Sequence, residues 1–299
     1  MWIKRLALAL TLVASAVQAD PKFKSFHDIL AMPHAEAAQR IAYGPDPRQF
    51  GELWLPRGKG PHRLVVMIHG GCWRADLPGL ELQAPLSAAL AARGWAVWNL
   101  EYRRIGHPAG GWPGTFQDVA QGVDAVRNFS AAKRIDLSRV VFVGHSAGGH
   151  LATWAAARHG ILKTSPLWAK DPLNPKAVIS LAGIIDLQAY RATGPDACGG
   201  PTVIEDLVGW KARGDAAFAD TSPPLMAPSG VRQVVVSGGL DPIVPARFGQ
   251  AFTVRAAASG DPVTHRLFPD AGHFELIDPT SPAWNHLFVE LEALVPAHD

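Results

Sequence analysis

Residues 140–149 read VVFVGHSAGG, an apolar run that leads directly into a serine between Gly144 and Gly148. A short apolar run is typical of a buried strand, and residues 151–158 have the composition of a helix. A serine at such a strand-to-helix junction is the pattern of a nucleophile elbow, a sharp turn that holds the hydroxyl clear of the backbone. Glycines suit this turn because they lack a Cβ. The stretch therefore predicts a strand, a tight turn and a helix, with Ser146 as a candidate nucleophile.

On either side of this stretch, strand-like and helix-like segments alternate. We expect strands at residues 53–56, 63–69, 95–102, 140–143, 177–181, 233–237 and 265–268, and helices at 85–93, 116–129, 151–158, 246–258 and 284–294. Near-continuous apolar strands that alternate with helices predict an α/β fold, a mostly parallel central sheet with helices on both faces. In such sheets, functional sites form beyond the carboxyl ends of the strands.

Residues 186–230 interrupt the alternation. They are rich in glycine and proline, and only 203–211 look helical. A connection this long is usually a functional loop, so we expect a small lid or insertion. Residues 20–299, with the insertion included, are expected to form a single domain.

Three further segments carry chemistry, and each follows a predicted strand. His69-Gly70-Gly71-Cys72-Trp73 follows the strand at 63–69, Asp241 follows 233–237, and His273 follows 265–268. A serine hydroxyl needs an adjacent base to become a nucleophile. Histidine is suited to that task near neutral pH, and an aspartate can fix its tautomer. Ser146, Asp241 and His273 are therefore the candidate catalytic residues, with Asp186 as the main rival for the acid.

Other residue types have simpler interpretations. The remaining histidines fit structural or pocket-lining positions better than the role of base, and His145 is expected beside the substrate. Trp73 and Trp112 are candidates for the pocket wall, although core packing is the default for a tryptophan. No histidine pair lies in a metalloprotease motif, so we expect no metal site.

The order Ser, Asp, His and the His-Gly-Gly-x-Trp segment resemble the α/β-hydrolase superfamily, and within it the His-Gly-Gly-x-Trp esterases and the kynurenine formamidase-like enzymes. The resemblance covers roughly residues 53–294 and implies an α/β-hydrolase fold. It also implies an oxyanion hole formed by backbone N–H groups of Gly70, Gly71, Cys72 and Ala147. Cys72 stands where the formamidase-like group usually has an aromatic residue.

These features predict a serine hydrolase that cleaves carboxylic esters of small to medium acyl groups through an acyl-enzyme, without a cofactor. The insertion at 186–230 is not strongly apolar, whereas a lipase acting at an oil interface would need a more apolar lid. An arylformamidase-like amidase is the alternative, followed by a peptidase and by a catalytically inactive binding protein. The partner is expected to be a small-molecule ester, and the sequence does not indicate an oligomeric state.

The first nineteen residues have the pattern of a secretory signal peptide: a basic start, an apolar core at 6–17, and small residues before Asp20. The apolar run is shorter than the roughly 20 residues of a membrane span, so we expect no stable anchor and a periplasmic or secreted protein. Removing Lys4 and Arg5 leaves 26 basic and 26 acidic residues, a net charge of zero. Such a balance gives no reason to expect a nucleic-acid partner.

The chain has two cysteines, Cys72 and Cys198. In an oxidising compartment they could form a disulfide, which would tether the predicted oxyanion loop to the insertion. Two isolated thiols are the alternative.

Overall fold

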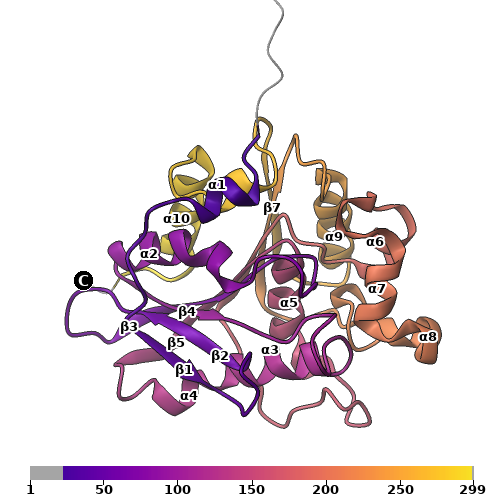
Figure 1. Ribbon diagram of the computed structural model, residues 1–299, viewed down its shortest axis with the longest axis horizontal. Helices are drawn as coiled ribbons and strands as arrows, with labels where there is room; N and C mark the ends of the chain where they lie inside the picture. The colour runs from indigo at the N-terminus through magenta and orange to yellow at the C-terminus, as the bar shows by residue number, and fades with distance from the viewer. Residues whose placement is uncertain (1–22, 298–299) are drawn as a thin grey trace, which may run out of the picture.

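The structure is a computed structural model that describes residues 23–297 (Figure 1). The predicted signal peptide at 1–19 lies outside the described residues. The described part is built around one eight-stranded sheet in the order β1-β2-β4-β3-β5-β6-β7-β8. Its strands are β1 (Gln39–Ala42), β2 (Phe50–Trp54), β3 (His62–Ile68), β4 (Trp95–Leu100), β5 (Ile135–His145), β6 (Ala177–Leu181), β7 (Arg232–Gly238) and β8 (Val263–Phe268).

One strand of the sheet, β2, runs in the direction opposite to all the others. β1 pairs with β2, and β2 with β4, in antiparallel fashion, whereas every other neighbouring pair is parallel. Strands β4 and β6 and residues 139–145 of β5 are buried, which explains the nearly continuous apolar sequence of these segments. The predicted α/β-hydrolase fold is therefore confirmed, with an antiparallel edge at β1 and β2.

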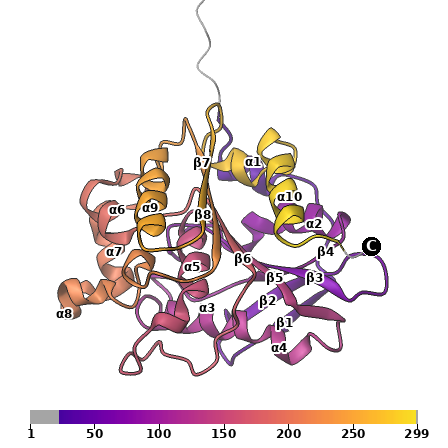
Figure 2. The same ribbon diagram turned by 180° about the vertical axis from the view of Figure 1, so that it is seen from behind.

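Helices cover both faces of the sheet. They are α1 (Phe26–Leu30), α2 (Ala84–Ala92), α3 (Gly114–Asp124), α4 (Val126–Phe129), α5 (Ala147–Ala156), α6 (Leu187–Thr193), α7 (Gly200–Val208), α8 (Trp210–Arg213), α9 (Ala246–Ala258) and α10 (Pro282–Leu294). Figures 1 and 2 show α2 and α10 on one side of the sheet and α5 and α9 on the other.

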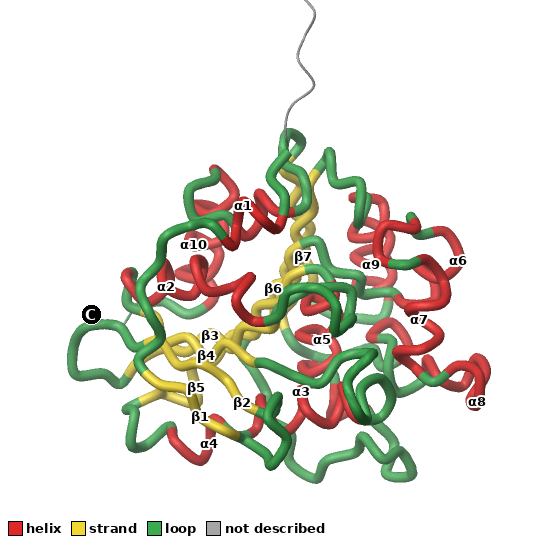
Figure 3. The backbone as a smooth tube through the Cα atoms, viewed as in Figure 1, coloured by secondary structure: helices red, strands yellow, loops and turns green. Residues whose placement is uncertain are grey.

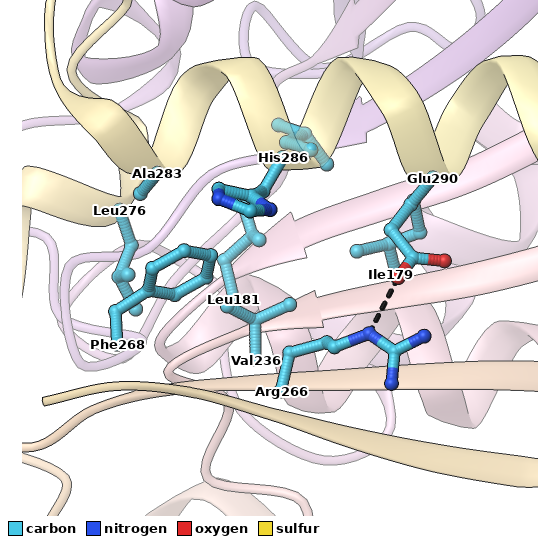
Figure 4. A pocket seen from close by; sticks show the side chains of 10 residues that line it. Ile179, Leu181, Val236, Arg266, Phe268, Leu276, Ala283, His286 and Glu290 are labelled. Carbon is cyan, nitrogen blue, oxygen red and sulfur yellow. Dashed lines mark hydrogen bonds and ion pairs between the residues drawn. The ribbon is translucent and has the colours of Figure 1, made fainter.

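Helix α10 is packed tightly on its face of the sheet. Figure 4 shows His286 of α10 beside the ring of Phe268, and Glu290 accepting a 2.6 Å hydrogen bond from Arg266 Nε. The space between helix and strands there is about 10 Å³, room for about one water molecule. This space between α10 and the sheet is too small to hold a substrate.

Three expectations from the sequence need correction. The helix predicted at 116–129 is divided at Ala125 into α3 and α4. The insertion holds more helix than its composition indicates, because α6, α7 and α8 all lie within it. They form one group beside α9 in Figure 3. The stretch before residue 53, where the sequence analysis expects no strand or helix, contributes α1, β1 and most of β2.

Within the insertion, helices begin and end where the sequence allows it. Gly209 adopts a φ of 67° between α7 and α8, a conformation that glycine tolerates and most residues avoid. Asp186 caps the start of α6 by accepting a hydrogen bond from Ala189 N–H at 3.0 Å. Such local capping is difficult to separate from loop composition in the sequence alone.

Candidate active site

Ser146 lies at the tight turn between β5 and α5. Its φ of 56° and ψ of −122° are far from ordinary strand or helix values, a strain of the kind found at functional sites. The turn is possible because neighbouring backbones touch: a Cβ on Gly148 would lie 2.1 Å from the carbonyl oxygen of Ile68. The elbow is therefore seated directly on the end of β3.

His273 and Asp241 meet at the ends of β8 and β7. His273 Nδ1 lies 2.6 Å from Asp241 Oδ2. The other carboxylate oxygen, Oδ1, accepts hydrogen bonds from the N–H groups of Ile243 and Val244, both at 2.8 Å. All of the carboxylate's partners therefore come from nearby loops, and the imidazole is left with Nε2 for a further contact.

Asp186, the rival acid, has a different environment. Its carboxylate caps α6 and forms an ion pair with Arg255. No contact between Asp186 and His273 is found in the described structure. The geometry therefore pairs His273 with Asp241.

The loop after β3 passes beside the serine. A Cβ on Gly70 would lie 3.1 Å from Ser146 Cβ, so the two backbones are close neighbours. Gly71, Cys72 and Trp73 follow with positive φ angles of 98°, 48° and 56°. Two successive non-glycine residues in this region mark a strained loop that its surroundings must hold in place.

A buried polar network holds that loop. The His69 ring lies between the Gly70 carbonyl, 2.7 Å from Nδ1, and Glu101 Oε1, 3.1 Å from Nε2. Tyr102 stacks on the same ring and donates a hydrogen bond to the His69 carbonyl. Arg104 donates to the carbonyls of residues 74, 77 and 78 farther along. His69 thus has a structural role, as the sequence favours for the histidines other than His273, and it supports the loop together with Glu101, Tyr102 and Arg104.

The charge within this network is balanced. Burial by itself would raise the pKa of Glu101, but His69, Arg104 and the Tyr102 N–H lower it to about 2. The carboxylate is thus ionised at neutral pH, between the imidazole and the guanidinium. Breaking this group would leave a buried charge unpaired, which is strongly destabilising.

Cys72 and Cys198 form a disulfide with their Cα atoms 5.3 Å apart. Cys198 ends η3 (Asp196–Cys198), the short turn before α7. The bridge therefore ties the loop after β3 to the insertion, and the possibility of two isolated thiols is excluded. Its neighbour Ala197 lines the cavity beside Ser146.

His145 lies beside His273 at the base of the site. Its Nε2 is 3.1 Å from the His273 carbonyl oxygen, and the ring centroids are 4.4 Å apart. Burial, with a smaller contribution from His273, lowers the pKa of His145 well below its usual range. The ring is therefore neutral, and its Nε2–H donates to the loop that carries His273.

A cavity of about 170 Å³ opens beside Ser146 and His273. Gly71, Cys72 and His145 also line it, as the sequence predicts for residues near the substrate. The rest of its wall is largely apolar and comes mainly from Phe26, Leu77, Pro78, Leu82, Ile243 and Phe274. Phe274 and Ile243 are close in sequence to His273 and Asp241, but no sequence signal indicated Phe26.

The two tryptophans lie elsewhere. Trp73 is fully buried, with its ring edge-on to His150. Trp112 carries the guanidinium of Arg213 over its ring at 4.0 Å. Neither lines the cavity beside Ser146, which is consistent with core packing as the default for these residues.

Two further properties concern residues 23–297. Within this range, no helix has the length and apolar character needed to cross a bilayer. The same residues contain no group of three or more His, Cys, Asp or Glu side chains arranged to hold a metal ion.

A family model described as BD-FAE matches residues 52–255, a range that includes Ser146, Asp241 and the loop after β3. The chain belongs to the BD-FAE family. BD-FAE proteins are α/β-hydrolase esterases. An isoprenylcysteine alpha-carbonyl methylesterase of Arabidopsis thaliana is 33% identical over 122 residues, which cover 40% of this chain and 27% of the relative. The chain spans only about a third of the length of the curated relatives that it matches.

Solved structures agree on the fold of this BD-FAE chain. Esterase B from Lactobacillus Rhamnosis has a TM-score of 0.76 at 21% identity, covering 90% of both chains. A truncated carbohydrate esterase from gut microbiota has a TM-score of 0.71 at 19% identity, covering 87% of this chain and 96% of its own. At these identities the likeness concerns the fold. The comparisons do not support the arylformamidase-like alternative.

Proposed function

We propose that this protein hydrolyses carboxylic esters through an acyl-enzyme formed on Ser146. The observation that carries the proposal is that the Ser146 turn and the Asp241-paired His273 line one cavity. Asp241 occupies Nδ1 of the imidazole, so Nε2 is the nitrogen available to the serine. Membership of an esterase family supports the same reaction.

The chemistry proceeds in two halves. Ser146 Oγ attacks the ester carbonyl while His273 Nε2 takes its proton, and Asp241 stabilises the imidazolium. The tetrahedral intermediate collapses, the C–O bond to the alcohol breaks, and His273 returns the proton to the leaving alcohol. Water then attacks the acyl-enzyme with His273 again as the base. The acid is released and Ser146 is restored.

The negative charge on the intermediate requires hydrogen-bond donors. Ala147 is the first residue of α5, and the amides of the first helical turn have no partner within the helix. The backbone N–H of Ala147 and those of Gly70, Gly71 and Cys72, in the loop braced by His69, form the proposed oxyanion hole. Each such donor contributes roughly 3–4 kcal/mol to the transition state.

The cavity supports a small or medium, uncharged acyl substrate. Its wall is mostly apolar, and among residues 23–297 no Lys, Arg, Asp or Glu lines it. A volume of about 170 Å³ is below the roughly 300–1,000 Å³ usual for sites that enclose drug-sized ligands. A long acyl chain would therefore have to extend out of the cavity.

We also propose that the protein is exported to the periplasm or to the exterior of the cell. It is supported by the signal-peptide pattern at 1–19 and by the Cys72–Cys198 disulfide, a bond that persists mainly in oxidising compartments. The mature protein would begin at Asp20. Intact mass and N-terminal sequencing of protein from the producing cells test this start, and a retained Met1 in the exported fraction would contradict it.

The activity is tested by intact-mass spectrometry after exposure to a fluorophosphonate. We expect one adduct on the wild type and none on Ser146→Ala, with hydrolysis of p-nitrophenyl butyrate reduced about 10⁶-fold in the variant. Ser138→Ala, which alters an exposed serine on β5, is the matched control and should label like the wild type. An unlabelled, folded wild type would favour a catalytically inactive binding protein. N-formylkynurenine, assayed in parallel, tests the amidase alternative.

A further inference from the structure

One part of the cavity wall comes from the N-terminal segment. Phe26, the first residue of α1, lines the cavity together with Ser146 and His273. Its ring lies edge-on to Phe274, with the centroids 6.4 Å apart. The side chain is half-buried, so one part faces the site and another part faces solvent. Phe26 therefore lies at the boundary between the cavity and the exterior.

The segment is fixed to the loop that carries His273. The backbone N–H of Lys24 donates to Glu275 Oε1 at 2.6 Å, and Lys24 Nζ lies 2.5 Å from Asp278 Oδ2. Phe23 is also in close contact there, because a Cβ on Gly272 would lie 3.1 Å from its ring. These contacts are made at Gly272, directly before the candidate base, and at Glu275 and Asp278, which follow it in the same segment.

The ion pair in this anchor is maintained at neutral pH. Burial would raise the pKa of Asp278, but its bonds with Lys24 and Thr280 lower the pKa below its ordinary value. The carboxyl side chain is only 2% exposed, so solvent screens this pair less than a surface pair. Lys24 thus holds the chain two residues before Phe26 at a defined place.

Helix α1 depends on this docking. It has only five residues, too few for a helix that is stable by itself. A capping box between Ser25 and Asp28 closes its start, and Ile29 is fully buried beneath it. Figures 1 and 2 both show α1 beside α10, on the side of the sheet away from α9. The position of Phe26 therefore follows from contacts on both sides of it.

We propose that Phe26 is a specificity-determining residue whose ring limits the length of the apolar group that the cavity accepts. This inference rests on the proposed esterase function and adds that an N-terminal residue selects among its substrates. The group it limits is an uncharged alkyl or aryl chain on either the acyl or the alcohol side of the ester, because both sides adjoin Ser146. A smaller side chain at this position extends the cavity outward, and a larger one shortens it.

Two ester series test the proposal in Phe26→Ala, Phe26→Trp and the wild type. The first varies the acyl chain of p-nitrophenyl esters from acetate to octanoate. The second varies the alcohol of acetate esters from ethyl to hexyl, and hydrolysis is measured as the release of protons. In one series, we expect Phe26→Ala to raise the ratio of kcat/KM for six-carbon over two-carbon chains by about tenfold, in line with the effect of methylenes in apolar pockets. Phe26→Trp should lower the same ratio.

Leu30→Ala is the matched control, because Leu30 belongs to the same helix but is exposed and does not line the cavity. It should leave both ratios at the wild-type value. Opposite shifts in the two Phe26 variants cannot come from loosening of α1, which would change both in the same direction. If both ratios stay within twofold of wild type in both variants, or both variants shift them alike, the inference is wrong. A wild type that hydrolyses no ester would instead overturn the proposed function.

Discussion

At the scale of single residues, Asp241 and Asp186 show how similar sequence positions acquire different tasks. Both follow a buried strand, and the sequence leaves either one able to orient the base. In the fold, Asp186 is used to cap α6 and to pair with Arg255, whereas Asp241 contacts His273 Nδ1. Their surroundings therefore decide the roles.

This difference gives a matched pair of variants. Asp241→Asn should lower kcat by roughly 10²–10⁴-fold, because an amide can favour the wrong imidazole tautomer and stabilises the imidazolium less. Asp186→Asn should change kcat less than about threefold, although it weakens a helix cap and an ion pair. Steady-state rates with p-nitrophenyl butyrate, on samples with native circular dichroism, measure both. Equal losses in the two variants would contradict the assignment of Asp241.

At the scale of structural elements, the disulfide joins two segments that the sequence separates widely. Cys72 and Cys198 are 126 residues apart, so the bond removes much conformational freedom from the unfolded chain. In the folded protein the bond holds the strained loop after β3 against η3. One bond therefore stabilises the fold and positions a loop of the candidate site.

Removing the bond should affect both properties. We expect Cys72→Ala/Cys198→Ala to lower the free energy of unfolding by about 2–5 kcal/mol in urea titrations. The backbone N–H of residue 72, a proposed oxyanion donor, remains in the variant but loses the bond that positions its loop, so kcat should fall by more than KM changes. The control is a thiol count on denatured, unreduced wild type, which should give no free thiols. An unchanged unfolding midpoint in the double variant would show that other contacts suffice to hold the loop.

At the scale of the whole molecule, the sequence predicts those strands and helices that a local run or a regular spacing of apolar residues marks. The apolar runs of β3, β4 and β5 and the serine turn after β5 are local features, and the parallel sheet follows from their alternation with helices. Order along the chain also selects Ser146, Asp241 and His273 as the candidate catalytic residues. The Cys72–Cys198 pairing and the place of Phe26 depend on contacts between distant segments, so composition and periodicity could not specify them. In the insertion, α6 was missed because its capping residue Asp186 resembles a loop residue, and the helix expected at 203–211 is divided at Gly209 into α7 and α8.

Buried histidines give the whole molecule a characteristic pH dependence. Burial lowers the pKa of His150 to about 4, and His145 shifts in the same direction for the same reason. His150 Nε2 lies 2.8 Å from the Thr221 carbonyl oxygen, and its ring packs edge-on against Trp73 and Phe116. In the unfolded chain an ordinary histidine has a pKa near 6.5. Between pH 6.5 and 4 the unfolded state therefore binds more protons, and stability falls as the pH is lowered.

We expect the free energy of unfolding to fall by on the order of 2 kcal/mol between pH 7 and pH 5 from His150 alone. Urea titrations at pH 7, 6 and 5 measure this loss. His150→Gln removes the titrating group, so it should be less stable at pH 7 but lose less stability on acidification. Glu101 titrates in a separate window: its pKa of about 2 lies below the ordinary value near 4.5, so its contribution is lost only as the pH falls from about 4.5 toward 2. If wild type and His150→Gln lose the same stability between pH 7 and pH 5, His150 does not govern this window.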